Sequence, residues 1–290
     1  MFSPAIVIPA VMNGVLTGAV YALIALGLTL IYGVLHIINF AHGALLTAAL
    51  FAVYFAFKVL GIDPYMSVFA IAPLFFAFGY LLQRFVIGPA SHGDERNVLL
   101  VTLGIAIVIE NLALYVFHAD TRTIDVPAGF NVIDVGVALL GVSRVIGLCA
   151  VIALTLLLWA FMRFTDTGKA IRAVASEQLG AQLAGIDVTH IYAITFGLGT
   201  ACLAVAACLL IPTFYVNPNV GRGFVLVAFT IVVLGGMGSV AGSLVGGILV
   251  GVIESLGGLF FGESLGQLGI FLVFILVLLV RPTGLFGARA

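Results

Sequence analysis

The sequence predicts an all-α polytopic membrane protein with about nine transmembrane helices, eight or ten being the alternatives. Of its 290 residues, 63% are hydrophobic and only 8% are charged, and the mean hydropathy is +1.31. A soluble domain carries roughly 25% charged residues, so that class is excluded. Residues 1–57 contain no Lys, Arg, Asp or Glu. Because a bilayer span takes about 20 apolar residues, this run is long enough for two spans.

Polar loops and glycine breaks divide the apolar sequence into its elements. Most of the polarity lies in four loops, at residues 88–97, 118–143, 163–190 and 216–222. The first three spans precede the first of these loops. The N-terminus, before the first span, lacks the basic region of a cleavable signal peptide. The next three spans lie between successive loops. The seventh is short and is broken at Gly235 and Gly236. The predicted spans are 10–31, 35–57, 65–86, 98–117, 144–162, 190–213, 223–237, 239–261 and 266–280.

The orientation follows from the basic residues of the short loops. With loop 163–190 in the cytoplasm, seven basic residues lie inside, namely Arg84, Arg96, Arg163, Lys169, Arg172, Arg281 and Arg289. Four lie outside, namely Lys58, Arg122, Arg144 and Arg222. The excess of inside charge predicts an external N-terminus and a cytoplasmic C-terminus.

The two halves of the sequence show a possible internal repeat. Residues 38–43 (INFAHG) and 234–239 (LGGMGS) each open an apolar helix rich in small residues. Four spans, one linker span and four spans would give the halves opposite orientations, as in many transporters. The similarity is weak enough that chance remains the alternative.

Small residues recur four apart along two predicted spans. The pairs are Gly14 with Gly18, Gly238 with Gly242, Gly242 with Gly246, and Gly247 with Gly251. Such spacing lets helix backbones approach closely in lipid. Tight packing is favoured over a specific dimerisation signal, and we expect a compact bundle.

Polar residues inside the spans are candidates for lining a translocation pathway, because each costs free energy unless it faces protein or water. The candidates are Asn13, Tyr21, Asn39, His42, Glu110, Asn111 and Glu254. For Asn39 and His42 the alternative is an interhelical hydrogen bond near a helix break. Glu110 has no basic residue on its own span, so it is either neutral or paired with another helix.

The loop at residues 165–187 is predicted to be helical and to couple the protein to a partner. Its composition favours two short helices joined near Gly180. The apolar face of such a loop needs a partner to cover it; the alternative is a helix lying on the membrane surface. The candidate coupling residues are Gly168, Lys169, Arg172, Glu177, Gly180 and Gly185.

Motifs for catalysis or energy conversion are missing from the sequence. It contains no G-x-x-x-x-G-K-[ST] loop, no spaced His/Cys/Asp cluster for a metal and no G-x-S-x-G elbow. Its three cysteines lack the spacing that is typical of metal sites or disulfide frameworks. A net charge of −1 gives no reason to expect a nucleic-acid partner. We therefore expect no enzyme, no catalytic residue and no metal, with any uphill transport driven by another subunit or an ion gradient.

Separated motifs in this chain strongly resemble those of LivH-type permeases of branched-chain amino acid ABC importers. They are residues 13–33 (NGVLTGAVYALIALGLTLIYG) with 38–43, the coupling loop at 168–186, the glycine break at 233–239 (VLGGMGS) and the end at 281–287 (RPTGLFG). Together they extend over nearly the whole chain, which we treat as one permease domain, residues 1–290.

The resemblance implies one membrane subunit of an ATP-driven importer in the bacterial inner membrane. Such subunits work with a second related permease, two cytoplasmic ATPases and a periplasmic solute-binding protein. The ATPases would bind ATP and Mg, so this chain would hold no cofactor, and one ATPase would dock on the coupling loop. The substrates would be branched-chain amino acids or related small polar solutes, moved by alternating access.

Two other functions stay open at this point. An ATP-independent channel or secondary transporter of the urea or amide type would also be apolar and polytopic, although it would not need a long helical cytoplasmic loop. An intramembrane enzyme would use His42 or His36 with a carboxylate, and the sequence shows no nucleophile or metal set beside them.

Overall fold

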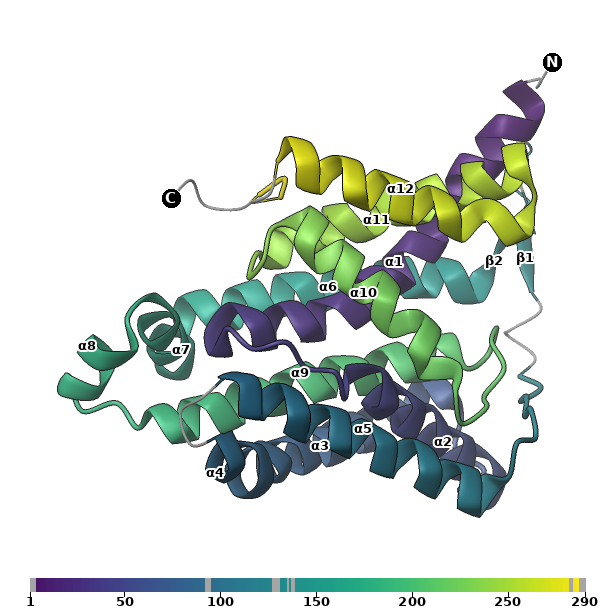
Figure 1. Cartoon of the computed structure of the whole chain (residues 1–290). Coiled ribbons are helices and arrows are strands. Elements are labelled where there is room, and N and C mark those ends of the chain that lie inside the picture. Colours follow the sequence, from purple (N-terminus) through teal and green to yellow (C-terminus); the bar gives the residue numbers. More distant parts are fainter. Residues whose placement is uncertain are drawn as a thin grey trace.

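A computed structural model describes residues 4–91, 95–126, 131–134, 136, 139–281 and 284–286 (Figure 1). The predicted inside charge Arg289 lies outside these residues, as do Pro282, Thr283 and Gly287 of the C-terminal motif. The elements in chain order are α1 (Pro4–Leu35), α2 (His42–Leu60), α3 (Pro64–Leu82), η1 (Gln83–Ile87), α4 (Gly88–Ser91), α5 (Glu95–Phe117), β1 (Val132–Asp134), β2 (Leu139–Gly141), α6 (Val142–Phe164), α7 (Asp166–Ser176), α8 (Gln178–Leu183), α9 (Val188–Leu210), α10 (Val220–Gly235), α11 (Val240–Phe261) and α12 (Glu263–Val280).

The helices confirm the predicted class. In the described part of the chain, nine helices have 16 or more residues, and each coincides with one predicted span. Seven are long and apolar enough to cross a membrane; α10 and the stretch Leu265–Val280 of α12 are shorter apolar helices. The seventh span is short because α10 ends where Gly236 takes a φ of +96°.

Two helices form the centre of the bundle. In the most apolar segments of α1 and α9, 83% and 78% of the residues are buried, against 22% in α3, α5 and α11. With 32 residues, α1 is about 48 Å long at 1.5 Å per residue, which exceeds the roughly 30 Å hydrocarbon thickness. Such a helix must tilt or project, and Figure 1 shows α1 crossing the bundle obliquely.

The glycine pattern packs α1 against α11. A methyl group at Gly18 would lie 2.8 Å from the Cα atom of Ile248, and one at Gly14 would lie 2.8 Å from the Cα atom of Val252. On the facing helix, Gly247 leaves no room for a side chain beside Ala22. The backbones therefore touch without intervening side chains, so the tight-packing interpretation is correct for this helix pair.

The contacts between helices reveal the repeat. Matching α1, α2, α3 and α5 with α9, α10, α11 and α12 makes the contact of α1 with α11 equivalent to that of α3 with α9. The contact of α1 with α10 likewise becomes equivalent to that of α2 with α9. Helix α6 links the halves, and α1 and α9 run in opposite directions in Figure 1. The fold is thus an inverted repeat of four helices each.

The repeat aligns differently from the sequence-based pairing. The backbone N–H of Ala41 donates to Oδ1 of Asn39 at 3.0 Å, and the N–H of Asn219 donates to Oδ1 of Asn217 at 3.0 Å. These identical turns open α2 and α10, so residues 38–43 correspond to 216–221, and pairing them with 234–239 was wrong. The second glycine-rich segment serves another purpose: Gly236 and Gly238 supply the positive φ angles that join α10 to α11.

The helical loop and the small sheet lie at opposite ends of the molecule (Figure 1). Two short helices form the loop, as predicted, but their junction is Glu177 and not Gly180. Glu177 adopts an extended conformation (φ −155°, ψ 104°), whereas Gly180 lies inside α8. Gly185, with φ +84°, follows the end of that helix. The error arose because glycine lowers helix propensity without forbidding a helix.

Candidate functional site

Helix α7 is held firmly against the bundle. The Thr165 hydroxyl accepts a hydrogen bond from the N–H of Gly168 at 3.0 Å, which caps the helix. Ile171 and Val174 are buried, and α7 packs on α6, α9 and α1. A methyl group at Gly168 would lie 2.6 Å from the Cα atom of Met162. The glycine therefore sets how closely α7 approaches α6.

Helix α8 leaves an apolar face uncovered. Leu179 and Leu183 are four residues apart, so they share one helix face, and they are 63% and 83% exposed. Ala181 turns toward the protein instead. Of the predicted coupling residues, Gly168 is buried, while Lys169, Arg172, Glu177, Gly180 and Gly185 are exposed. Lys169 pairs with Asp166 at 2.9 Å.

Asn39 and His42 are fully buried at the start of α2. Nε2 of His42 lies 2.9 Å from the carbonyl oxygen of Ile24 on α1; because a carbonyl can only accept, Nε2 carries the hydrogen. Asn39 organises the turn described above. The interhelical hydrogen bond that the sequence left as an alternative is thus present for His42, and neither side chain reaches the surface of the subunit.

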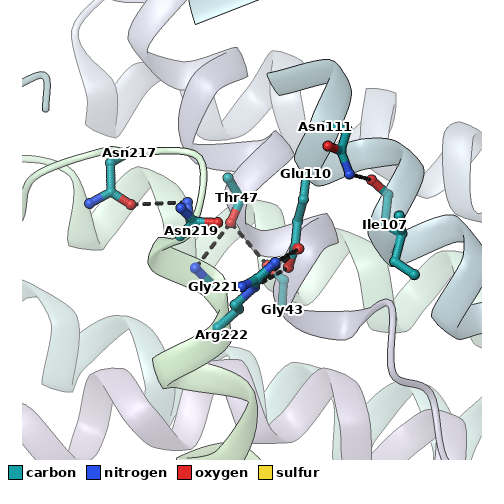
Figure 2. Close-up of polar contacts among 9 residues, drawn as sticks. All are labelled: Gly43, Thr47, Ile107, Glu110, Asn111, Asn217, Asn219, Gly221 and Arg222. Atoms are coloured by element: carbon teal, nitrogen blue, oxygen red, sulfur yellow. Dashed lines mark hydrogen bonds and ion pairs between the residues drawn. The ribbon is translucent and has the colours of Figure 1, made fainter. Parts of the chain in front are cut away.

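Glu110 forms an ion pair with the second half of the chain (Figure 2). Nε of Arg222 lies 3.1 Å from both carboxylate oxygens, and Nη2 lies 2.5 Å from Oε2. The side chain of Glu110 is 13% exposed and that of Arg222 is 67% exposed. Of the two alternatives for Glu110, the structure shows the partner on another helix. Neighbouring Asn111 donates instead to the carbonyl of Ile107 at 2.8 Å and is exposed.

A hydroxyl group joins α2 to α10 beside this pair. The Thr47 hydroxyl donates to the Gly43 carbonyl at 3.2 Å and accepts from the N–H of Gly221 at 3.1 Å (Figure 2). Gly43 and Gly221 face each other so closely that neither has room for a side chain. Sequence reasoning missed Thr47 and placed Arg222 only in a loop. The sequence did contain a reason to select Arg222 as a candidate, because it is the sole charged residue from 188 to 253.

The remaining candidates gather where α1, α6 and α11 meet. Nη1 of Arg144 donates to Oδ1 of Asn13 at 3.4 Å. The Tyr21 hydroxyl lies close to the Glu254 carboxylate, whose buried Oε2 atom has no hydrogen-bond partner among the described residues. The ring of Tyr21 packs edge-on against Phe224 of α10 at 6.0 Å. The structure therefore brings Tyr21 and Glu254 together. Asn13 lies about two helical turns before Tyr21 on α1 and pairs with Arg144 instead.

An apolar groove of about 330 Å³ runs between α2 and α5. Its walls include Ala48 and Phe51 from α2 and Ile109 and Ala113 from α5. Phe51 stacks on Phe117 with ring centroids 4.0 Å apart. The groove begins within one helical turn of Thr47 and Glu110, since Phe51 and Ala113 follow those residues by four and three positions.

No grouping of three or more His, Cys, Asp or Glu side chains suited to a metal occurs within the described ranges. The features that the structure does show are a helix with an uncovered apolar face, an inverted repeat and a polar contact between the repeats. These features are typical of a transport subunit.

Comparisons with known proteins identify the family. The family model described as "Branched-chain amino acid transport system / permease component" matches residues 10–280. The chain is 34% identical to the high-affinity branched-chain amino acid permease protein BraD of Pseudomonas aeruginosa, covering 95% of this chain and 94% of BraD. It is 33% identical to LivH of Escherichia coli, again over 95% and 94%, and 26% identical to the probable LivH of Methanocaldococcus jannaschii, over 91% and 88%. The solved structure of PsaBC from Streptococcus pneumoniae with a Fab aligns at a TM-score of 0.47 and 18% identity, covering 96% of this chain and 91% of that one. The chain belongs to the permease-component family of branched-chain amino acid transport systems.

Proposed function

We propose that this protein is the membrane-spanning permease subunit of an ABC importer for branched-chain amino acids or related small polar solutes. The observation that carries this function is the family match over residues 10–280, together with relatives named as branched-chain amino acid permeases that align over nearly their whole length. The protein would work by alternating access in the bacterial inner membrane. Its assembly would contain a second homologous permease, two ATPase subunits and a periplasmic solute-binding protein.

The docking site of the ATPase is the α7–α8 unit. Its rigid part is α7, fixed by the close approach at Gly168, and its projecting part is α8, with Leu179 and Leu183 uncovered. A ligand shifts a conformational equilibrium only if it binds the two conformations differently. A rigid α7 supports this requirement, because it would pass a movement of the docked ATPase directly to α6 and α9. ATP and Mg would be bound entirely by the ATPase subunits.

The orientation proposed from the basic residues agrees with this docking site. The α7–α8 unit would face the cytoplasm along with the C-terminus, and the β1–β2 pair at the other end would face the periplasm (Figure 1). Val132 and Leu139 of this pair are exposed apolar residues. They offer a surface to the solute-binding protein.

The translocation pathway is proposed to follow the contact between the repeats. Tyr21, Glu254 and Asn13 are only partly buried and lie beside α10 and α11. Glu110 adds a charge on the opposite side of α10, next to exposed Asn111. Asn39 and His42 would act from behind the pathway by holding the helix break that gives α2 its position.

The experiment is ATP-dependent uptake of radiolabelled leucine by proteoliposomes that contain the complete transporter and its binding protein. In the same preparation, Leu179→Glu with Leu183→Glu places charge on the α8 face, and we expect loss of ATPase co-purification and of uptake. Leu139→Glu is the matched control for ATPase co-purification alone, because it puts the same charge on an exposed leucine at the other end of the molecule, where the ATPase would not dock. Normal ATPase binding by the α8 variant would remove α8 from the docking surface. ATP-independent uptake by the permease alone would instead establish the channel or secondary transporter.

A further inference from the structure

Arg222 has a position that helix stability does not explain. It lies in the first turn of α10, where the helix dipole is positive and a cation is unfavourable. The equivalent residue of the first repeat is Ala44, since residues 38–43 correspond to 216–221, and Ala44 is buried and apolar. The charge is therefore specific to the second repeat and lies beside the point where the two repeats touch.

The ion pair with Glu110 orients the Arg222 guanidinium but engages only one of its edges. Glu110 occupies the side formed by Nε and Nη2. Nη1 has no hydrogen bond to any described residue, and the side chain is 67% exposed. An arginine presents five N–H donors in a rigid fork, and two of them can bind one carboxylate. The free edge of Arg222 is thus available to a second carboxylate while Glu110 holds the first edge.

The surroundings fit the rest of an amino acid. The apolar groove between α2 and α5 begins within one helical turn of the ion pair and has a volume of about 330 Å³. This is the lower end of the range for small-molecule sites, roughly 300–1,000 Å³. Its walls near the pair, which include Ala48, Phe51 and Ala113, would suit an aliphatic side chain. In inverted-repeat transporters, solute sites lie at the contact between the repeats; the ion pair joins the two repeats, and the groove extends from it within the first repeat.

We propose that Arg222 binds the α-carboxylate of the transported amino acid, with Glu110 as its positioning residue and the α2–α5 groove taking the aliphatic side chain. The proposal rests on the proposed function, and it adds that the permease itself recognises the carboxylate. A solute without a carboxylate, such as an amide, would lose this contact.

The test begins with a charge exchange in the complete transporter. Glu110→Arg combined with Arg222→Glu keeps an ion pair between α5 and α10 but moves the carboxylate-binding edge from α10 to α5. We expect leucine uptake to stay at least about tenfold below wild type, since a hydrogen bond to a charged group is worth about a factor of ten or more. Uptake restored to the wild-type rate would show that the pair is only a structural latch and would overturn the proposal.

Two single variants keep the test decisive if the exchanged protein folds poorly. Arg222→Lys keeps the charge but loses the planar fork, so we expect a rise in KM of about tenfold or more. Lys58→Gln is the control, because it removes an exposed positive charge from α2 and should leave uptake unchanged. Wild-type KM in Arg222→Lys would contradict the proposal.

A binding measurement separates this site from the solute-binding protein. Saturation-transfer NMR on the membrane complex without that protein should show leucine contacts that weaken in Arg222→Lys, whereas leucinamide should give equal signals in both. Equal leucine signals would overturn the site alone. Failure of the wild-type transporter to import any amino acid would instead show that the proposed function is wrong.

Discussion

The contact between α1 and α11 makes a quantitative prediction about Gly18. The substitution Gly18→Ala adds a methyl group that would lie 2.8 Å from the Cα atom of Ile248, so the helices must separate. Overpacking of this kind costs about 1–3 kcal/mol. Replacing a helical glycine by alanine also stabilises the helix by about 1 kcal/mol. Gly104→Ala isolates this second effect, because Gly104 lies in α5 with nothing within 4 Å of the added methyl group.

The difference between the two variants measures packing alone. Because the propensity gain is shared, Gly18→Ala should be less stable than Gly104→Ala by about 1–3 kcal/mol, which corresponds to about 2–12 °C in Tm. A thiol-reactive fluorogenic dye measures Tm in detergent, since Cys202 and Cys208 are buried until the protein unfolds. The measurement uses a Cys149→Ser background, which removes the exposed thiol. Equal Tm values would refute the inference that glycine is needed for this helix contact.

Two further predictions concern helix α7. Thr165→Ala removes the hydroxyl that caps α7 at Gly168, and it should cost about 1 kcal/mol, seen as faster amide exchange in the first turn of α7; unchanged exchange would show that the cap is unimportant. The hydrogen bond from Lys169 lowers the pKa of the exposed Asp166 carboxyl. The small stabilisation of the folded state by this bond is therefore present above the ordinary Asp pKa and is lost as the pH falls through the lowered pKa of Asp166. Lys169→Met should return the pKa of Asp166 toward its ordinary value, measured by NMR titration of the carboxyl carbon, and an unmoved titration would refute the assignment.

The spans were predictable because their boundaries are set by local chemistry. Hydrophobic runs must end at polar loops, and α10 ends at Gly235 because the following glycines adopt positive φ angles. The glycine spacing also predicted close helix packing, since small residues four apart share one helix face, although it did not specify that α1 packs on α11. Both signals lie within a single helix, where sequence distance and spatial distance agree.

The site was less predictable because its contacts join distant parts of the chain. Glu110 and Arg222 are 112 positions apart, and nothing in either segment specifies the other. The helix junction at Glu177 was missed for a different reason. Backbone hydrogen bonding continues through Gly180, while Glu177 adopts an extended conformation between α7 and α8. Nothing in the local sequence marks Glu177 as a helix break, because helix propensity is only a weak guide to helix ends.

The repeat itself was visible in the sequence only as a resemblance between glycine-rich segments, and this led to the wrong pairing. The true pairing depends on two asparagine side chains that accept the same backbone hydrogen bond. Gly43 and Gly221, which are equivalent in the two repeats, also face each other. A residue that meets its own equivalent lies on the axis relating the repeats, so this contact marks the axis.

Differences between equivalent residues at the axis are therefore the places where function departs from symmetry. The backbone there must remain symmetric, because the Asn39 and Asn217 turns and the facing glycines fix both helix starts. A transported amino acid has no such symmetry, with a charged end and an apolar end. Equivalent side chains on the two sides of the axis would bind such a solute equally well in two orientations, so one orientation is selected by side chains that differ between the repeats. Arg222 is such a side chain, because it is charged and exposed whereas its equivalent Ala44 is apolar and buried.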